Sequence, residues 1–227
     1  RLLLLLRNWR GLVIDGSESN IQDIKSQNIH WRHALTTQSI FINRDNINDL
    51  IREWTMIGEV GLLSIDIDGN DYWVWDSISI VSPAILIIEY NAVFGDIHKI
   101  TIPYQSDFQR TRAHSSNLYF GASLPAMICL GSKKGYTFIG TNSNGVNAFF
   151  VRDDLAHLVT NGMHEICSYP SLFREARDPS GRLLFLSSLE RLEHIKSLPV
   201  VDLDQGVSKL LSGFEQVYSP AWVNGTK

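Results

Sequence analysis

The chain has 227 residues, of which 44% are hydrophobic and 19% are charged, and its formal net charge at pH 7 is -4. The length and composition are those of an ordinary globular protein, and one α/β domain is the simplest expectation. A negative charge without clustered Lys and Arg excludes a broad nucleic-acid-binding surface. Cys129 and Cys167 are too few for a disulfide framework or a thiolate zinc site, and they favour a reducing, cytoplasmic setting.

The first apolar segment is RLLLLLRNW, residues 1–9. It has a run of only five leucines and no small-residue cleavage site after it, so we expect a buried helix and neither a signal peptide nor a membrane span. Next, Gly11 precedes LVID, a short apolar run that ends in Asp15 and predicts a buried parallel strand. The polar run GSESN begins a second helix, which extends to about residue 28. SIFIN then predicts a strand to about residue 42, followed by a turn and a helix.

Two further predicted strands are GLLSIDID (61–68) and AILIIEYN (84–91), and each ends in acidic or amide groups. A helical YWVWDSI and the break at Pro83 separate them. SLPAMICLGSKK (123–134) predicts a helix with Pro125 in its first turn and Gly135 near its end. In GYTFIGTNSNGVNAFFVRDD, two strand-like runs flank NSNG, a turn signal that joins antiparallel neighbours.

Strands that alternate with helices predict a mostly parallel sheet with right-handed crossovers, which ends in an antiparallel hairpin. Residues 1–155 form this expected core. From residue 156 the alternation is lost, although RLLFLSSLERLEHIKSL has helical spacing. We therefore expect residues 156–227 to form a helical or irregular appendage packed on the sheet.

Acids stand at three predicted strand ends: Asp15, the pair Asp66 and Asp68, and Glu89 with Asn91. In an open parallel sheet, ligands bind outside the carboxyl ends of the strands. Side chains two apart on a strand share a face, so we expect Asp66 and Asp68 to point the same way, and likewise Glu89 and Asn91. If the strands are neighbours, three carboxylates converge, and their repulsion raises their pKa values unless a cation joins them.

Several cations suit such a corner. Mg²⁺ or Mn²⁺ prefers oxygen ligands of the kind that Asp68 and Glu89 offer, and a cofactor with sulfonium and ammonium groups also suits. An EF-hand is excluded, because Gly69 stands at the fourth position of the D-x-D series and that loop needs glycine at the sixth. The alternative is that Asp66 or Asp68 caps the following helix and that Asp71 is a solvated acid in its first turn.

An acid such as Asp15, at a strand end of a doubly wound sheet, commonly accepts the ribose hydroxyls of an adenosyl or dinucleotide cofactor. No GxGxxG or GxGxG precedes it, so the alternative is that it caps the SESN helix. At least one of Trp73 and Trp75 is expected in the core. His114 lies in the polar segment TRAHSSN, where it is either a general base or substrate contact, or a solvated residue without a role.

The segments WRGLVIDGSESN, NINDLI, GLLSIDIDGNDYWVW, ILIIEYNAVFG, TIPY, YFGASLPAMICLGSKKGY and GVNAFFVRDDL cover roughly residues 2–155. Together they resemble the FkbM-like S-adenosylmethionine-dependent methyltransferases of bacterial polysaccharide and natural-product gene sets. IDIDGNDY and NAFFVR are the most specific of these segments.

This resemblance implies the class I methyltransferase fold, a Rossmann-like sheet of seven strands with an antiparallel terminal hairpin. It implies that Asp15, with Gly16 and Ser17, binds the cofactor, and that Asp66 binds it as well. The family's IDxEG-type strand end matches Asp66 and Asp68, and Asp68 stands where many relatives carry Glu. The family's glycine-rich first loop is absent from the sequence given.

The activity that the resemblance implies is in-line transfer of a methyl group from S-adenosylmethionine to an acceptor oxygen, expected to be a sugar hydroxyl of a small molecule or glycan. Asp68, Glu89 and Asn91 are expected to act as base, or Asp68 and Glu89 as ligands of a divalent cation. His114 is a reserve base.

Two other functions compete with this one. In a glycosyltransferase, Asp66-Ile67-Asp68 is a D-x-D motif that holds Mn²⁺ and a nucleotide diphosphate. In a non-catalytic relative, the sheet serves as a partner-binding module and the appendage forms the contact of a homo-oligomer.

Overall fold

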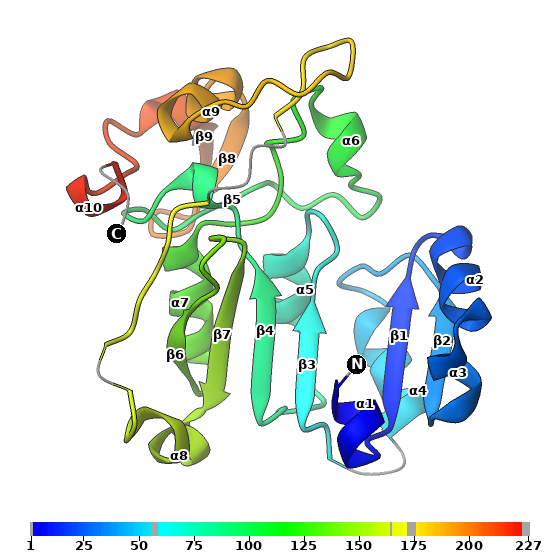
Figure 1. Ribbon diagram of the computed structural model, residues 1–227. Coiled ribbons are helices and arrows are strands. Elements are labelled where there is room, and N and C mark those ends of the chain that lie inside the picture. Colours follow the sequence, from blue (N-terminus) through cyan, green and yellow to red (C-terminus); the bar gives the residue numbers. More distant parts are fainter. Residues whose placement is uncertain (1, 56–58, 164, 172–175, 224–227) are drawn as a thin grey trace.

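The computed structural model describes residues 2–55, 59–163, 165–171 and 176–223, which form an α/β fold with three sheets (Figure 1). One sheet is a parallel pair, β1 (Gly11–Asp15) and β2 (Leu35–Ser39). The central sheet has the order β3-β4-β7-β6, with the bounds Leu62–Ile65, Ile85–Glu89, Asn147–Arg152 and Tyr136–Thr141. The last has the order β5-β8-β9, with the bounds Ile100–Thr101, Pro199–Asp202 and Val207–Leu210.

Helical elements alternate with the strands along much of the chain. They are α1 (Leu2–Arg7), α2 (Glu18–Ser26), α3 (Asn28–Arg32), α4 (Ile47–Thr55), α5 (Asp71–Ser77), η1 (Ala92–Phe94), α6 (Arg110–Ala113), α7 (Leu124–Lys133), η2 (Asp153–Leu155), α8 (Ala156–Thr160), α9 (Ser188–Ile195), η3 (Leu211–Gly213) and α10 (Pro220–Val223). None of the helices described is both long and apolar enough to cross a lipid bilayer.

The central sheet confirms the predicted hairpin. β6 and β7 are antiparallel neighbours, and β7 also lies antiparallel to β4. The prediction of a mostly parallel sheet is wrong, because among the described strands only β1 with β2 and β3 with β4 are parallel pairs. Few strand pairs are parallel for two reasons. β1 and β2 form no backbone hydrogen bonds of a sheet with β3, so they stay a separate pair, and β8 and β9 add a second antiparallel hairpin.

The helices α5 and α7 lie against one face of the central sheet (Figure 1). α7 begins where predicted, because Ser123 caps it by accepting a hydrogen bond from the Ala126 N–H and Pro125 occupies the first turn. Beneath these helices, the ring of Trp75 is buried against Phe150 of β7 at a centroid distance of 5.2 Å. The expected core position of a tryptophan is thereby confirmed.

Two apolar segments differ from their predictions. The leucine-rich segment forms α1, but it is not a buried helix, since none of its residues is buried and Leu6 is 72% exposed. The strand predicted over SIFIN, from Ser39 to about Ile42, is wrong: β2 covers Leu35–Ser39 and shares only Ser39 with it, because the register ends where Ser39 pairs with Asp15, the last residue of β1. Phe41 therefore lies beyond the sheet, 43% exposed.

The segment from residue 156 onward contains strands as well as the expected helix. β8 pairs with β5 of the preceding part, with Thr101 opposite Val201. Gly95 has a φ of 78°, and a Cβ there would lie 1.9 Å from the carbonyl oxygen of Val217. The appendage thus packs directly on the backbone of the core, and β8, β9 and α9 lie beyond the edge toward which β3 and β4 point (Figure 1).

Candidate functional site

The acidic side chains of Asp66, Asp68, Asp71 and Glu89 lie where β3 and β4 end, and we call this region the polar corner. β3 ends at Ile65, so Asp66 and Asp68 belong to the turn before α5, and the two-residue alternation of a strand does not apply to them. Asp68 has a φ of 55°, in the left-handed region that few non-glycine residues adopt. The expectation that both acids point the same way from a strand is therefore wrong in its premise.

Asp71 holds this turn together. Its side chain is fully buried, and its two carboxylate oxygens accept hydrogen bonds from the N–H groups of Ile67 and Gly69, each at 2.9 Å. The expectation of a solvated acid is wrong, because the turn folds back over the start of α5. Gly69 packs against the ring of Phe108, and a Cβ at Gly69 would lie 2.2 Å from that ring.

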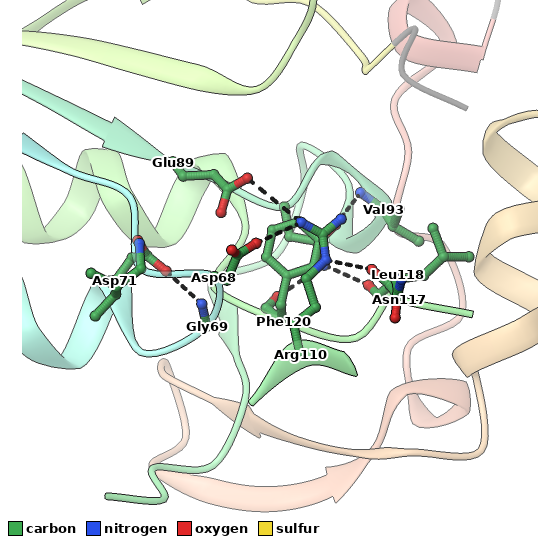
Figure 2. Close-up of polar contacts among 11 residues, drawn as sticks. Asp68, Gly69, Asp71, Glu89, Val93, Arg110, Asn117, Leu118 and Phe120 are labelled. Carbon is green, nitrogen blue, oxygen red and sulfur yellow. Dashed lines mark hydrogen bonds and ion pairs between the residues drawn. The ribbon is translucent and has the colours of Figure 1, made fainter. Parts of the chain in front are cut away.

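Arg110 of α6 supplies the positive charge of the corner. Its guanidinium donates to Asp68 Oδ1 at 2.9 Å and lies 4.0 Å from Glu89 Oε1. The same group lies 3.8 Å above the ring of Phe120 and donates from Nε to the Asn117 carbonyl. Figure 2 shows the carboxylates of Asp68 and Glu89 both turned toward this guanidinium.

Glu89 is a buried carboxyl group with a raised pKa. It is 6% exposed, and its Oε2 is buried without a hydrogen-bond partner among the described residues. Burial raises the pKa of Glu89 to about 9, with further contributions from Asp71, Asp66 and Asp68 that Arg110 only partly opposes. With its pKa raised in this way, the Glu89 carboxyl is able to donate a hydrogen bond at neutral pH, although no acceptor for Oε2 lies among the described residues.

The neighbouring acids shift in the same direction. Burial raises the pKa of Asp71 to about 6, although three backbone N–H groups oppose the shift. Partial burial of the carboxylate and then the charge of Asp68 raise the pKa of Asp66. Both shifts follow from burial and from the mutual repulsion of the acids, as expected for carboxylates that crowd together.

Within the described residues, the side-chain amide of Asn91 forms all its hydrogen bonds with backbone groups. Its Nδ2 donates to the carbonyls of Leu118 and Phe120 at 2.8 and 2.9 Å, and its Oδ1 accepts from the Val93 N–H at 2.9 Å. It is 1% exposed and caps η1. These bonds give Asn91 a positioning role, because they hold the backbone of the segment that carries Phe120.

Two cavities meet at the Asp68–Arg110 pair. The smaller one, of about 240 Å³, has an apolar wall of Phe41, Ile67 and Phe108. The larger one, of about 550 Å³, is also lined by Glu89 and by residues of the appendage. Asp68, Arg110 and Thr111 line both cavities, so a ligand in one lies next to a ligand in the other.

Three of the residues expected to bind a cofactor lie at the end of β1, and the fourth, Asp66, follows β3. Asp15 accepts hydrogen bonds from the Ser17 N–H at 2.7 Å and from Asn20 Nδ2 at 3.0 Å, and Ser17 caps α2. The alternative that Asp15 caps the helix is therefore wrong, since Ser17 is the capping residue and Asp15 only orients Ser17 and Asn20. Each carboxylate oxygen of Asp15 keeps further acceptor capacity. Gly16 lies against Phe41, since a Cβ there would approach the Phe41 ring at 3.1 Å. Phe41 is the link between this strand end and the smaller cavity.

His114 and Asp66 line neither of the two cavities. The Nδ1 atom of His114 lies 2.7 Å from Ser116 Oγ, and partial burial and then His194 lower the pKa of His114. The structure therefore does not bring these two residues together with Asp68 and Glu89 at the cavity wall.

A metal ion does not fit this corner as it stands. Within the part of the chain that the structure describes, no group of three or more His, Cys, Asp or Glu side chains is arranged to hold one. Asp68 is paired with a guanidinium, and Glu89 keeps its proton at neutral pH. The predicted positive charge is present, but Arg110 provides it.

Sequence reasoning missed Arg110 and the site role of Phe41. Arg110 and Arg112 stand two apart in FQRTRAH, and no local pattern distinguishes them. Phe41 looks like part of a buried strand, because the sequence does not reveal where the register of β2 ends.

Comparisons of the chain with protein-family models, with curated proteins and with solved structures found no match.

Proposed function

We propose that the protein is an S-adenosylmethionine-dependent O-methyltransferase that acts on a sugar hydroxyl. The observation that carries the proposal is the pair of cavities that meet at Asp68 and Arg110, where Asp68 follows the end of β3 and Glu89, the last residue of β4, lines the larger cavity. Group transfer needs a donor and an acceptor held in contact, and adjoining cavities provide this. The antiparallel hairpin at one edge of the central sheet and the resemblance in residues 2–155 support the class I fold.

The smaller cavity suits the cofactor. Its apolar wall includes Phe41, an exposed ring of the kind on which a purine stacks, and Asp68 offers a carboxylate to a cationic group. Asp15 and Gly16 lie at the adjoining strand end, where Asp15 has capacity to accept from ribose hydroxyls. The residues that would hold the cofactor are thus Asp15, Gly16, Phe41, Ile67 and Asp68.

The larger cavity suits a polyol acceptor. Its wall is rich in neutral amides, which both donate and accept hydrogen bonds as hydroxyl groups do. The wall carries such amides at Asn117, Asn144 and Asn147, whereas Asn91 uses its amide, and Asn142 its amide oxygen, in hydrogen bonds to the backbone. A sugar of a polysaccharide or natural product is the acceptor class that fits such a wall and the family resemblance.

The mechanism divides the work between two acids. When bound, the cofactor supplies an electrophilic methyl group on a sulfonium. Arg110 engages Asp68 Oδ1 at 2.9 Å, which leaves Oδ2 to accept the proton of the acceptor hydroxyl. Glu89 donates from its protonated carboxyl and so holds the acceptor in place rather than acting as the base.

The metal-dependent glycosyltransferase is less well supported. A D-x-D motif needs both acids at the metal, whereas Asp66 lines neither cavity and Asp68 pairs with Arg110. We therefore derive no step through a metal ion.

The first test is calorimetric titration of the full chain with S-adenosylhomocysteine, and separately with uridine and guanosine diphosphates, each with and without Mg²⁺ or Mn²⁺. We expect metal-independent binding of S-adenosylhomocysteine. Metal-dependent binding of a diphosphate would instead identify a glycosyltransferase, and no binding by any of them would favour the partner-binding module.

The role of Asp68 is tested by Asp68→Asn. We expect methyl transfer to a glycan acceptor to fall by about 100-fold, since loss of a general base typically has this effect. Binding of S-adenosylhomocysteine should weaken as well, because Asp68 loses the charge that it offers to the cationic group of the cofactor, so turnover is compared at saturating cofactor. Asp23→Asn, an exposed acid on α2, is the matched control and should keep full activity. Unchanged turnover in Asp68→Asn would remove the residue from the mechanism.

A further inference from the structure

Glu89 and Asn147 stand directly opposite each other on the antiparallel strands β4 and β7. The neighbouring pair is hydrogen-bonded, because the Tyr90 N–H donates to the Val146 carbonyl at 2.9 Å. Bonded and non-bonded pairs alternate along an antiparallel ladder, so Glu89 and Asn147 form a non-bonded pair. In such pairs the Cα atoms are about 4.5 Å apart and the side chains lie closest together on one face of the sheet.

Both members of this pair line the larger cavity. Glu89 Oε2 is buried and has no hydrogen-bond partner in the described part of the chain. Asn147 differs from two other amides at the wall. Asn91 is committed to the backbone, and Asn142 Oδ1 accepts from the N–H groups of Val146 and Asn147. The carboxamide of Asn147 has no such bond within the residues described.

We infer that Glu89 and Asn147 form a two-point clamp for adjacent hydroxyl groups of a saccharide or another polyol. A protonated carboxyl and a carboxamide each carry at least one donor and one acceptor on neighbouring atoms, and the oxygen of a hydroxyl group both donates and accepts. Two such groups side by side on one face of a sheet match two hydroxyls on adjacent carbons. The clamp fixes which hydroxyl faces Asp68, so Asn147 is a specificity-determining residue.

This inference deepens the proposed function and rests on it only for the identity of the hydroxyl that is methylated. Recognition of a diol by the clamp needs no cofactor. Binding of a saccharide is therefore measured on the full chain alone, without S-adenosylmethionine.

The test is saturation-transfer NMR titration with the methyl glycosides of glucose, galactose and mannose and with their monodeoxy forms. We expect at least one glycoside to bind, and removal of either clamped hydroxyl to weaken binding about fivefold, the usual contribution of one neutral hydrogen bond. Failure of all three parent glycosides to bind, or equal binding by every monodeoxy form, would overturn the clamp.

Asn147→Ala is expected to weaken binding of the parent glycoside about fivefold. Asn161→Ala, the same change at an exposed position outside both cavities, is the control and should bind like the wild type. Asn147→Val is a second variant whose β-branched side chain suits a strand, which guards against loss of the fold.

The decisive comparison uses the deoxy glycosides with Asn147→Val. Removal of the hydroxyl that Asn147 contacts should weaken binding to the wild type but not to this variant. If every deoxygenation weakens glycoside binding to the variant as much as it weakens binding to the wild type, Asn147 is not part of a clamp. Saccharide binding without any S-adenosylhomocysteine binding would contradict the proposed function and leave the clamp intact.

Discussion

The variant Glu89→Gln is expected to become more stable than the wild type as the pH rises from about 5 to 9. The ordinary pKa of the carboxyl is 4.5, and in the folded protein it is raised to about 9. Between these values the folded state holds a proton that the unfolded state releases, so the free energy of unfolding of the wild type falls with rising pH. The fall is at most about 1.4 kcal/mol for each pH unit. Glutamine has nearly the same shape and no proton to lose.

The measurement is urea unfolding followed by circular dichroism at pH 5, 6, 7, 8 and 9. The difference in free energy of unfolding between Glu89→Gln and wild type should grow with pH and reach a few kcal/mol. Glu53→Gln, an exposed acid on α4, should give a curve parallel to that of the wild type. A parallel curve for Glu89→Gln itself would mean that Glu89 is ionised in the folded protein at neutral pH.

Replacement of Asp71 by alanine is expected to lower the free energy of unfolding by about 2–5 kcal/mol, since it leaves two backbone N–H groups without their acceptors. Both groups, on Ile67 and Gly69, lie in the turn that carries Asp68. Asp71→Asn keeps one acceptor oxygen and should lose about half as much.

The control for this change is Asp76→Ala, an exposed acid on the same helix, which should cost far less. Urea unfolding at pH 7 compares the three variants. If Asp71→Ala is as stable as Asp76→Ala, the carboxylate does not hold the turn. Because the charge of Asp71 contributes to the raised pKa of Glu89, Asp71→Ala should also flatten the pH dependence described above.

Local signals were sufficient for the elements that the chain specifies by itself. Pro125 in the first turn located the start of α7, and NSNG located the hairpin of β6 and β7. Register and pairing were not predictable, because they depend on contacts between distant segments. β2 therefore lies on LTTQS, residues 35–39, and shares only Ser39 with the apolar run SIFIN that was predicted as the strand, since β1 ends opposite Ser39.

At the site, sequence reasoning located the acidic residues but not their conformation, burial or ion-pair partners. The positions of Asp66, Asp68 and Glu89 at two neighbouring strand ends were readable from periodicity. The sequence did not reveal the left-handed conformation of Asp68, the burial of Asp71 or the ion pair of Arg110 with Asp68. Each depends on how the loops after β3 and β5 fold over the sheet edge, which no short pattern encodes.

The contact of Gly95 with the Val217 carbonyl has a consequence for protein engineering. The appendage supplies Ser171 and Arg191 to the wall of the larger cavity, and the same segment closes the core through Val217 and β8. A chimaera that exchanges residues 156–227 to alter acceptor choice must therefore preserve this close backbone approach. Truncation after residue 155 would strip β5 of its partner strand, so selectivity and stability cannot be tuned as separate modules.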